Sequence, residues 1–280
     1  MQVPFVKAHG ARNDFLITWG HLISPGIGDR AAAARTICDR HTGIGADGWI
    51  LLDVPSVSAG AAEPGADSDG FIELWNSDGS RSEISGNGTR CAAAVLVDEG
   101  KASNSVRIAT GAGLKRLQLL DRQGQVFSFE MDMGAARIEE LHSDVAAGRD
   151  AVILNVGNPQ CAVLVRDFDF DWRTLGAALE RHERFPNRTN VSFVRVADRH
   201  TLEVRFFERG AGETMSSGTG STGAAAAARA RGLVDDPVRV ITPAGVLHLR
   251  WRGDDILLAG PADEVCLYLA GPVSRAELPK

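Results

Sequence analysis

Short runs of apolar residues, separated by turns rich in glycine and polar residues, recur along the whole chain. Their lengths and their content of β-branched residues predict strands, whereas helical patterns are few. Because the predicted strands outnumber the helices and often follow one another directly, the pattern favours an α+β fold with mostly antiparallel sheets over a Rossmann fold. The predicted strands span residues 3–7, 15–19, 49–53, 71–75, 106–109, 126–131, 151–156, 161–165, 191–196, 202–207, 238–242 and 246–251, and the predicted helices span 29–40, 172–181 and the segments after residues 85 and 217.

Two stretches of the chain lack a periodic apolar pattern. The segment from Ser56 to Gly70 is rich in small and acidic residues, and it predicts a mobile surface loop. The polar, alanine-rich segment from Ala135 to Arg149 predicts a bridge between two halves of the chain. The chain length alone favours two domains.

An internal repeat supports two similar halves. The pattern S-G-x-G-x-x-x-A-A-A begins at Ser85 and again at Ser217, close to half a chain length apart. Each copy follows a glutamate, Glu83 or Glu213, and an apolar predicted strand. The repeat therefore indicates a duplicated domain with pseudo-twofold symmetry. The alternative is that two segments rich in small residues recur by chance.

The repeated segment has a chemical use at a helix start. A Ser-Gly-x-Gly segment that opens a helix presents free backbone N–H groups at the positive end of the helix dipole, which suits a carboxylate or a phosphate. A phosphate loop would more often carry a lysine, and neither copy has one, so a carboxylate fits better. The alternative is that Ser85 and Ser217 act only as helix N-caps.

Further polar clusters stand at predicted turns and strand ends. Asx turns are the structural alternative for the asparagines among them. The pair Glu208–Arg209 ends a predicted strand, where a carboxylate and a guanidinium could bind the ammonium and the carboxylate of an amino acid, or form only a surface ion pair. The asparagines at such positions are Asn13, Asn76, Asn158 and Asn190.

Composition narrows the class of protein. The net charge of −6 comes without a basic stripe, which argues against nucleic acid as a partner. No apolar stretch is long enough to span a membrane, and the N-terminus lacks a signal-peptide core, so we expect a cytoplasmic protein. The cysteines are widely spaced and the histidines form no ligand motif, which predicts buried or free thiols and no tightly bound metal. The cysteines are Cys38, Cys91, Cys161 and Cys266.

Seven motifs along the chain resemble those of the diaminopimelate epimerases, cofactor-independent amino-acid epimerases of lysine and peptidoglycan biosynthesis. Their number and order make a chance resemblance negligible. The motifs are H-G-A-R-N-D-F (9–15), D-R-H-T-G-I-G-A-D-G (39–48), N-S-D-G-S (76–80), S-G-N-G-T-R-C (85–91), G-N-P-Q-C (157–161), H-E-R-F-P-N-R-T-N-V (182–191) and E-R-G-A-G-E-T-x-x-S-G-T-G (208–220).

The resemblance implies a fold of two pseudo-symmetric domains, each a curved, mostly antiparallel sheet around a central helix. We expect the first domain to comprise residues 1–134 plus 266–280, because in this family the C-terminal segment returns to complete it. The second domain would comprise residues 135–265. A homodimer is expected from the resemblance alone.

The resemblance also implies a two-base reaction on a small amino-acid substrate, with no cofactor. One base removes the α-proton from one face, and the other delivers a proton to the opposite face. In this chain the two base positions hold Ser85 and Ser217. The residues that would bind the substrate carboxylate are Gly86, Asn87, Gly218 and Thr219, and those that would bind its amino groups and distal end are Asn13, Asn76, Asn158, Asn190, Glu208 and Arg209.

The serines depart from the family pattern, which has cysteine at both base positions. A thiol is readily tuned to a thiolate, whereas a serine hydroxyl stays protonated near neutral pH unless a neighbouring base accepts its proton. Glu83 or Glu213 could supply that base. Gln160 is a second departure, since the family usually has a histidine there that is thought to tune the thiols.

Several accounts of the two serines follow from the sequence. The chain could be an epimerase that works through Ser85 and Ser217, or an inactivated double mutant. Further departures at 215–216 and 221–222 argue against the mutant. It could also be a paralogue that binds an amino acid in the same cleft with lost or altered chemistry. A phenazine-type isomerase with a glutamate base is a weaker alternative. We expect an epimerase that interconverts LL- and meso-2,6-diaminopimelate.

Overall fold

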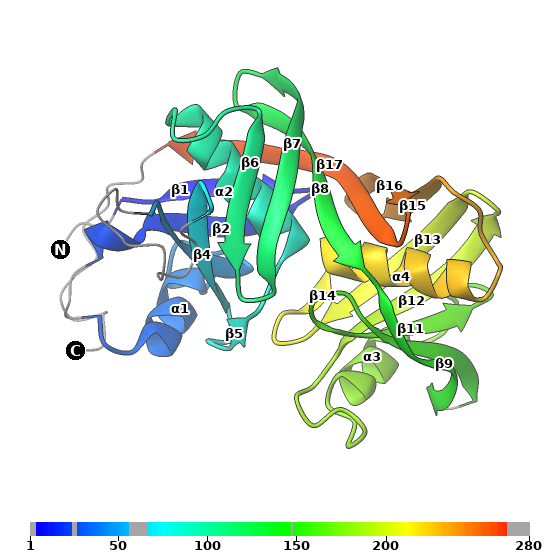
Figure 1. Cartoon of the computed structure of the whole chain (residues 1–280). Coiled ribbons are helices and arrows are strands. Elements are labelled where there is room, and N and C mark those ends of the chain that lie inside the picture. The colour runs from blue at the N-terminus through cyan, green and yellow to red at the C-terminus, as the bar shows by residue number, and fades with distance from the viewer. Residues whose placement is uncertain (1–3, 24–26, 56–66, 147, 268–280) are drawn as a thin grey trace. The chain divides into compact units, whose positions relative to one another are not determined.

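The computed structural model describes residues 4–23, 27–55, 67–146 and 148–267 of the chain. The chain divides into two compact units (Figure 1). Unit 1 comprises residues 1–131 and 261–280, and unit 2 comprises residues 132–260. The sequence prediction placed the boundaries at 134 and 266. Both observed boundaries lie inside long strands, β8 (Val126–Ala135) and β17 (Asp255–Leu267), so no change in composition marks them.

Unit 1 contains strands β1 (Val6–Gly10), β2 (Asn13–Trp19), β3 (Gly48–Asp53), β4 (Gly70–Asn76), β5 (Arg81–Ser82), β6 (Ser105–Thr110) and β7 (Gly113–Gln123), the 3-10 helix η1 (Gly20–Leu22) and helices α1 (Arg30–Cys38) and α2 (Gly86–Asp98). β1 pairs antiparallel with β2 and, on its other edge, with the end of β17. The C-terminal strand thus completes unit 1. Parallel pairs join β2 to β3 and β4 to β6, and the other pairs within unit 1 are antiparallel.

Unit 2 contains strands β9 (Arg137–Ala146), β10 (Arg149–Asn155), β11 (Pro159–Val165), β12 (Asn190–Asp198), β13 (Thr201–Glu208), β14 (Gly212–Thr214), β15 (Val238–Thr242) and β16 (Gly245–Arg252), with helices α3 (Trp172–Glu180) and α4 (Gly218–Ala230). Parallel pairs join β11 to β12 and β13 to β15. The remaining pairs are antiparallel, including those of β10 with β9 and of β16 with β17.

The same order of pairings occurs in both units, which confirms the internal repeat. In each, a hairpin is followed by a crossover helix, a parallel strand, an antiparallel strand, a short strand, a buried helix and a final hairpin. The register also repeats. Phe15 faces Gly48 across the β2–β3 pair, and Gln160 faces Asn190 across the β11–β12 pair. Asn13 and Asn158, each two residues earlier, therefore occupy equivalent positions.

The two repeated helices lie against the strands of their own units. α2 is buried from Gly86 to Leu96, and α4 is buried from Gly218 to Ala228. Glycine and alanine make up most of α4 and recur in α2, and their small side chains let the surrounding strands approach closely. The sequence prediction of a central helix packed closely in each half is confirmed.

A second helix covers the opposite side of each sheet. In unit 1, Ile37 of α1 packs in a cluster with Leu16 and Trp49 of the sheet. In unit 2, Trp172 of α3 packs with Phe193. Strands held between two helices are buried on both faces, which explains the mostly apolar sequences in the buried parts of β2, β3 and β12.

Several predicted elements require correction. The segment 135–149 is not a bridge, because most of it forms β9, whose charged side chains alternate with partly buried ones along an antiparallel pair with β10. β7 and β17 were not predicted, and the first strand begins at Val6 rather than Val3. Residues 56–66 of the predicted loop lie outside the described residues, and Gly70 belongs to β4.

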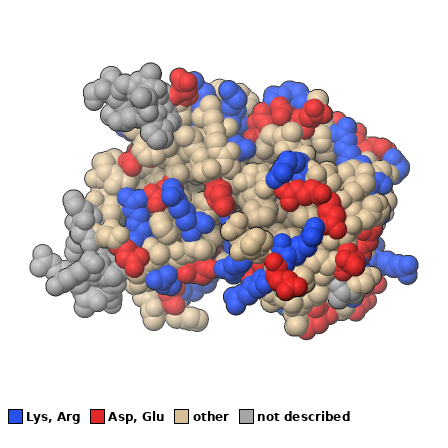
Figure 2. Space-filling view, turned by 60° about the horizontal axis from the view of Figure 1, so that its bottom comes forward, with Lys and Arg blue, Asp and Glu red and all other residues tan. Residues whose placement is uncertain are grey.

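On the face drawn in Figure 2, acidic and basic side chains are interspersed, with no continuous basic stripe. Among the described residues, no helix is long and apolar enough to cross a bilayer.

Candidate active site

Ser85 caps the first repeated helix. Its hydroxyl oxygen accepts a hydrogen bond from the N–H of Gly88 at 3.1 Å, and its carbonyl accepts one from the N–H of Thr89. The helix start is therefore well formed, with the backbone amides of Gly86 and Asn87 at its first positions. Within the described part of unit 1, no carboxylate lies within hydrogen-bond distance of the Ser85 hydroxyl. Ser85 thus caps a helix that is suited to an anion.

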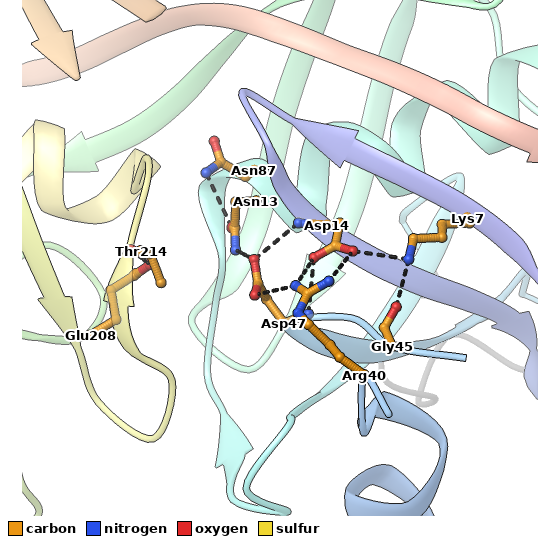
Figure 3. Close-up of polar contacts among 9 residues, drawn as sticks. All are labelled: Lys7, Asn13, Asp14, Arg40, Gly45, Asp47, Asn87, Glu208 and Thr214. Carbon is orange, nitrogen blue, oxygen red and sulfur yellow. Dashed lines mark hydrogen bonds and ion pairs between the residues drawn. The ribbon is translucent and has the colours of Figure 1, made fainter. Parts of the chain in front are cut away.

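Ser217 caps the second repeated helix and has a further partner. Its oxygen accepts from the N–H of Gly220 at 3.0 Å, and its hydroxyl donates to Oε2 of Glu208 at 2.7 Å. The other oxygen of Glu208 accepts from the hydroxyl of Thr214 at 2.6 Å (Figure 3). The carboxylate is thereby held by two hydroxyl groups, and it can accept the proton of Ser217.

The hairpin of β13 and β14 brings Glu208 to Ser217. Glu208 faces Gly212 across this pair, and Thr214 faces Phe206, so Glu208 and Thr214 lie on neighbouring strands. Glu213, a candidate helper base from the sequence, lies away from Ser217. Glu213 is exposed and forms two hydrogen bonds to Arg173, at 2.6 and 2.8 Å. Successive side chains point to opposite faces of a strand, which separates Glu213 from its neighbour Thr214.

The equivalent position in unit 1 has no carboxylate. Asn76 ends β4 as Glu208 ends β13. Its side-chain amide donates to the hydroxyl of Ser80 at 3.0 Å, and its backbone N–H donates to the carbonyl of Ser80, which closes the turn. The candidate helper Glu83 is exposed. The two repeats therefore share their helix starts but differ in the base beside the serine.

Asn13 follows a strained turn between β1 and β2. Ala11 and Arg12 both have positive φ angles, of 50° and 62°. This conformation is unfavourable for residues with a side chain, and strain of this kind persists where the surroundings hold it in place. The neighbouring Gly10 lets the chain approach α2, since a Cβ at Gly10 would lie 3.0 Å from Cβ of Asn87. Asn13 is thereby placed beside the start of α2.

Asn13 joins a chain of side-chain hydrogen bonds (Figure 3). Its Nδ2 donates to Oδ2 of Asp47 at 2.8 Å, and its Oδ1 accepts from Nδ2 of Asn87 at 3.2 Å. Oδ1 of Asn87 accepts in turn from Arg90 at 2.6 Å. Arg90 also donates to the carbonyls of Gly86 and Pro261. The buried guanidinium thus ties the start of α2 to β17.

A cluster of charged side chains surrounds Asp47, which accepts the hydrogen bond from Asn13. Arg40 donates to Asp14 at 2.6 Å and to Asp47 at 2.8 Å, and Lys7 lies 3.1 Å from Asp14. Burial would raise the pKa of Asp14, but the hydrogen bonds and positive charges of Arg40 and Lys7 lower it overall. Burial raises the pKa of Asp47, and the charge of Asp14 raises it further. The sequence analysis did not identify Lys7, Arg40 or Asp47, although motifs 9–15 and 39–48 contain most of the cluster.

In unit 2 the hydrogen bonds around the equivalent asparagine run in the other direction. Gln160 donates to Oδ1 of Asn158 at 2.7 Å, and Asn158 donates to the hydroxyl of Thr219 at 3.4 Å. All three side chains are buried. Oε1 of Gln160 has no hydrogen-bond partner among the described residues. Gln160 therefore orients Asn158 at the start of α4.

Asn190 and Arg209 link neighbouring segments. The side chain of Asn190 donates to the carbonyl of Pro159 at 3.0 Å and accepts from the backbone N–H of Arg209 at 3.1 Å. The guanidinium of Arg209 donates to the carbonyl of Asn187 at 3.3 Å. Both groups thus hold the backbone around the end of β13, where Glu208 lies.

The described cysteines, Cys38, Cys91 and Cys161, are buried, as the sequence predicted. Burial is the main factor that raises the pKa of Cys38 and of Cys161 to about 12. Neither thiol is suited to act as a base near neutral pH. The side chain of Cys266 lies outside the described part of the structure. Among the described residues, no three histidine, cysteine, aspartate or glutamate side chains gather as a metal site.

Comparison with known proteins identifies the family. The family model described as diaminopimelate epimerase matches residues 5–139 and 152–265. The chain belongs to the diaminopimelate epimerase family. The diaminopimelate epimerase of Pelotomaculum thermopropionicum is 36% identical, and the match covers 93% of this chain and 96% of the relative. That of Cupriavidus pinatubonensis is also 36% identical, over the full length of both chains. The chain is accordingly an amino-acid epimerase-like enzyme.

Solved structures support the fold of this epimerase family member. A hydroxyproline epimerase from Agrobacterium vitis, with bound trans-4-hydroxy-L-proline, matches with a TM-score of 0.71 at 16% identity and covers 97% of this chain and 94% of its own. A probable proline racemase from Agrobacterium radiobacter matches with a TM-score of 0.72 at 15% identity, covering 97% and 93%. These likenesses confirm the expected two-domain epimerase fold.

Proposed function

We propose that this protein interconverts LL- and meso-2,6-diaminopimelate without a cofactor, and that Ser217 with Glu208 forms one of its two acid/base groups. The observation that carries the proposal is the 2.7 Å hydrogen bond from the Ser217 hydroxyl to Glu208. A serine hydroxyl alone is too weak a base to remove an α-proton, and a carboxylate behind it supplies the missing proton acceptor.

The proton transfer at Ser217 balances as a relay. The Cα–H bond of the substrate breaks, its proton moves to Oγ of Ser217, and the original hydroxyl proton of Ser217 moves to Oε2 of Glu208. The electron pair of the broken bond stays on the substrate as a carbanion delocalised into its carboxylate. Thr214 donates to Oε1 of the same carboxylate and so fixes its orientation throughout the transfer. In the reverse direction Glu208 returns the proton through Ser217.

Inversion also needs a proton donor on the other face, and we assign that part to Ser85. Its hydroxyl can donate a proton to the carbanion without a base beside it. The resulting alkoxide would be stabilised by the N–H of Gly88 and by the start of α2. Because only Ser217 has a described carboxylate partner, we expect proton removal at Ser217 to be faster than at Ser85.

The two helix starts suit the charge that develops on the substrate. Removal of the α-proton increases the negative charge on the carboxylate, and backbone N–H groups at a helix start stabilise such charge more in the transition state than in the substrate. We assign this role to the N–H groups of Gly86 and Asn87 in α2, and of Gly218 and Thr219 in α4. The remaining polar groups assigned to substrate binding are Asn13, Asn76, Asn158, Asn190, Glu208 and Arg209.

A second candidate function is binding of an amino acid without proton exchange. It is favoured by the absence, within the described part of unit 1, of a carboxylate beside Ser85. A protein with one weak base and one unassisted serine could retain the ligand while the chemistry is lost. The helix starts and the asparagine network would serve either function.

The test is incubation of the purified protein with LL-2,6-diaminopimelate in D₂O, followed by mass spectrometry for α-deuterium and chiral chromatography for the meso isomer. We expect deuterium to appear together with the meso isomer. Saturable binding measured by calorimetry, with no deuterium and no meso product, would establish the binding function instead. Absence of both binding and exchange would refute both candidates.

A further inference from the structure

Two segments that are far apart in the sequence meet beside the start of α2. Asn13 and Asp14 begin β2, whereas Arg40 and Asp47 flank the loop that leads into β3. Figure 3 shows these side chains converging within unit 1, with Asn87 of α2 at one end and Lys7 of β1 at the other. The proposed reaction assigns a role to Asn13 and Asn87 but none to the charged side chains behind them.

The hydrogen bonds determine which way the amide of Asn13 faces. An ionised carboxylate only accepts hydrogen bonds, so Asp47 at 2.8 Å requires the NH₂ group of Asn13 on its side. Oδ1 of Asn13 then faces Asn87 and accepts its Nδ2 at 3.2 Å. A flipped amide would place two acceptors against each other at Asp47 and two donors against each other at Asn87. One orientation of Asn13 is therefore selected.

Asp47 is itself held firmly. Its Oδ2 also accepts the backbone N–H of Asp14 at 3.1 Å, and its Oδ1 accepts Arg40 at 2.8 Å. The same Arg40 is held by Asp14, which Lys7 approaches from β1. The carboxylate is fixed by three donors on two separate segments, β2 and the loop that carries Arg40, and it cannot rotate without breaking at least one of these contacts.

We propose that Asp47 is a positioning residue that fixes the amide of Asn13, so that the second N–H of Asn13 is presented to a hydrogen-bond acceptor of the substrate. This inference rests on the proposed function, because it takes Asn13 as a substrate-binding residue. Nδ2 of Asn13 carries two hydrogens, and one of them is used by Asp47. A carboxylate oxygen of an amino acid is an acceptor of the required kind.

The equivalent asparagine in unit 2 supports this inference by contrast. Oδ1 of Asn158 accepts its shorter hydrogen bond, at 2.7 Å from Gln160, whereas its Nδ2 donates to the hydroxyl of Thr219 at 3.4 Å. The shorter hydrogen bond of Asn13 is thus made to an acceptor, Asp47, whereas the shorter hydrogen bond of Asn158 is made to a donor, Gln160. The orientation of the amide is set separately in each repeat, and in unit 1 the residue that sets it is Asp47.

The orientation of the Asn13 side-chain amide can be tested by NMR, without a measurement of enzyme activity. The side-chain amide protons of Asn13 are assigned in ¹⁵N-labelled protein by their loss in Asn13→Ala. We expect Asp47→Asn to shift and broaden them, because the amide can then flip. The matched control is Asp69→Asn. Asp69 also accepts a backbone N–H, that of Arg107, and pairs with its guanidinium, and it is similarly exposed. If Asp47→Asn leaves the Asn13 signals unchanged, the inference is wrong.

The consequence for the reaction is tested by a double-mutant cycle. We expect Asp47→Asn to raise KM about tenfold, the effect of losing one hydrogen bond to a charged group, and to lower kcat by less than about threefold. In the Asn13→Ala background, the same change should alter KM by less than about twofold, because the group on which Asp47 acts is gone. An equal effect in both backgrounds would show that Asp47 acts through the fold and not through Asn13.

The outcomes separate the inference from the proposed function. A wild-type protein without exchange or binding refutes the function, and the amide signals of Asn13 then decide the positioning alone. A wild-type protein with activity that Asp47→Asn does not change refutes the inference alone. If Asp47→Asn fails to fold, Arg40→Gln is the second variant. It removes one of the hydrogen bonds to the Asp47 carboxylate but keeps the carboxylate itself, so it should broaden the Asn13 signals to a smaller extent.

Discussion

The hydroxyl of Ser217 donates to Oε2 of Glu208 at 2.7 Å, while the hydroxyl oxygen of Ser85, at the equivalent position of the other repeat, has the N–H of Gly88 as its partner among the described residues. The fold therefore repeats the helix cap but not the base.

Glu208→Gln should reduce α-deuterium exchange at least about a hundredfold, because loss of a positioned general base typically costs that much. The glutamine can still accept the Ser217 hydroxyl, so the fold should be preserved. Glu213→Gln is the control, since this carboxylate lies in the same hairpin but pairs with Arg173. Exchange followed by mass spectrometry for both variants checks the prediction, and equal losses in the two would assign the effect to the hairpin.

Replacement of both serines by cysteine should increase exchange. A free thiol has a reference pKa of about 8.5, far closer to neutrality than a hydroxyl, and a helix start stabilises the thiolate. The variant should also be inactivated by iodoacetamide, whereas the wild-type protein, which has serine at both base positions, should resist. Cys38 and Cys161 are buried and their pKa values are raised, so they are poor targets for the reagent. Rapid inactivation of the wild-type enzyme would point instead to a reactive native thiol.

Asp14→Asn should lower the free energy of unfolding at pH 7 by about 2 kcal/mol, from the loss of hydrogen bonds to charged partners. Because the pKa of Asp14 is lowered in the folded state, its contribution is present above the unfolded value and disappears as the pH falls through the folded value. The difference between wild type and variant should therefore shrink below about pH 3.8.

Urea unfolding at pH 7 and at pH 3 checks the prediction for Asp14. Asp255→Asn, which removes an exposed partner of Arg252, serves as the control and should change stability little. A difference for Asp14→Asn that stays constant over this pH range would contradict the ion-pair explanation.

Gly220→Ala should destabilise the protein by about 1–3 kcal/mol, the usual effect of overpacking. A Cβ at Gly220 would lie 2.8 Å from the ring of buried Phe206 and 3.0 Å from Cβ of Ser217. Gly88→Ala, at the equivalent position in unit 1, meets Cδ1 of Ile50 at 3.0 Å, and the end of that side chain can move. Thermal unfolding should rank Gly220→Ala as the more harmful change, and the reverse order would contradict this account.

The sequence predicted best the strands whose hydrophobic pattern reflects their burial in the structure. β2, β3 and β12 lie between helices, so their central residues are buried on both faces and are mostly apolar in sequence. β7 and β9 carry charged residues on an exposed face, and apolar and polar residues alternate only weakly along their sequences. For this reason the sequence predicted no strand at β7 and a polar bridge at β9. The domain boundaries fall within β8 and β17, where no local signal marks them.

For the site, the sequence determined the family, the repeat and the two serine caps, because these depend on residue types at fixed local spacings. Only the tertiary structure decided which groups meet. The β13–β14 hairpin brings Glu208, rather than Glu213, to Ser217. Pairing of β2 with β3 brings Asp47 to Asn13. Contacts between residues distant in sequence depend on strand register and side-chain direction, which the local pattern of a single sequence does not contain.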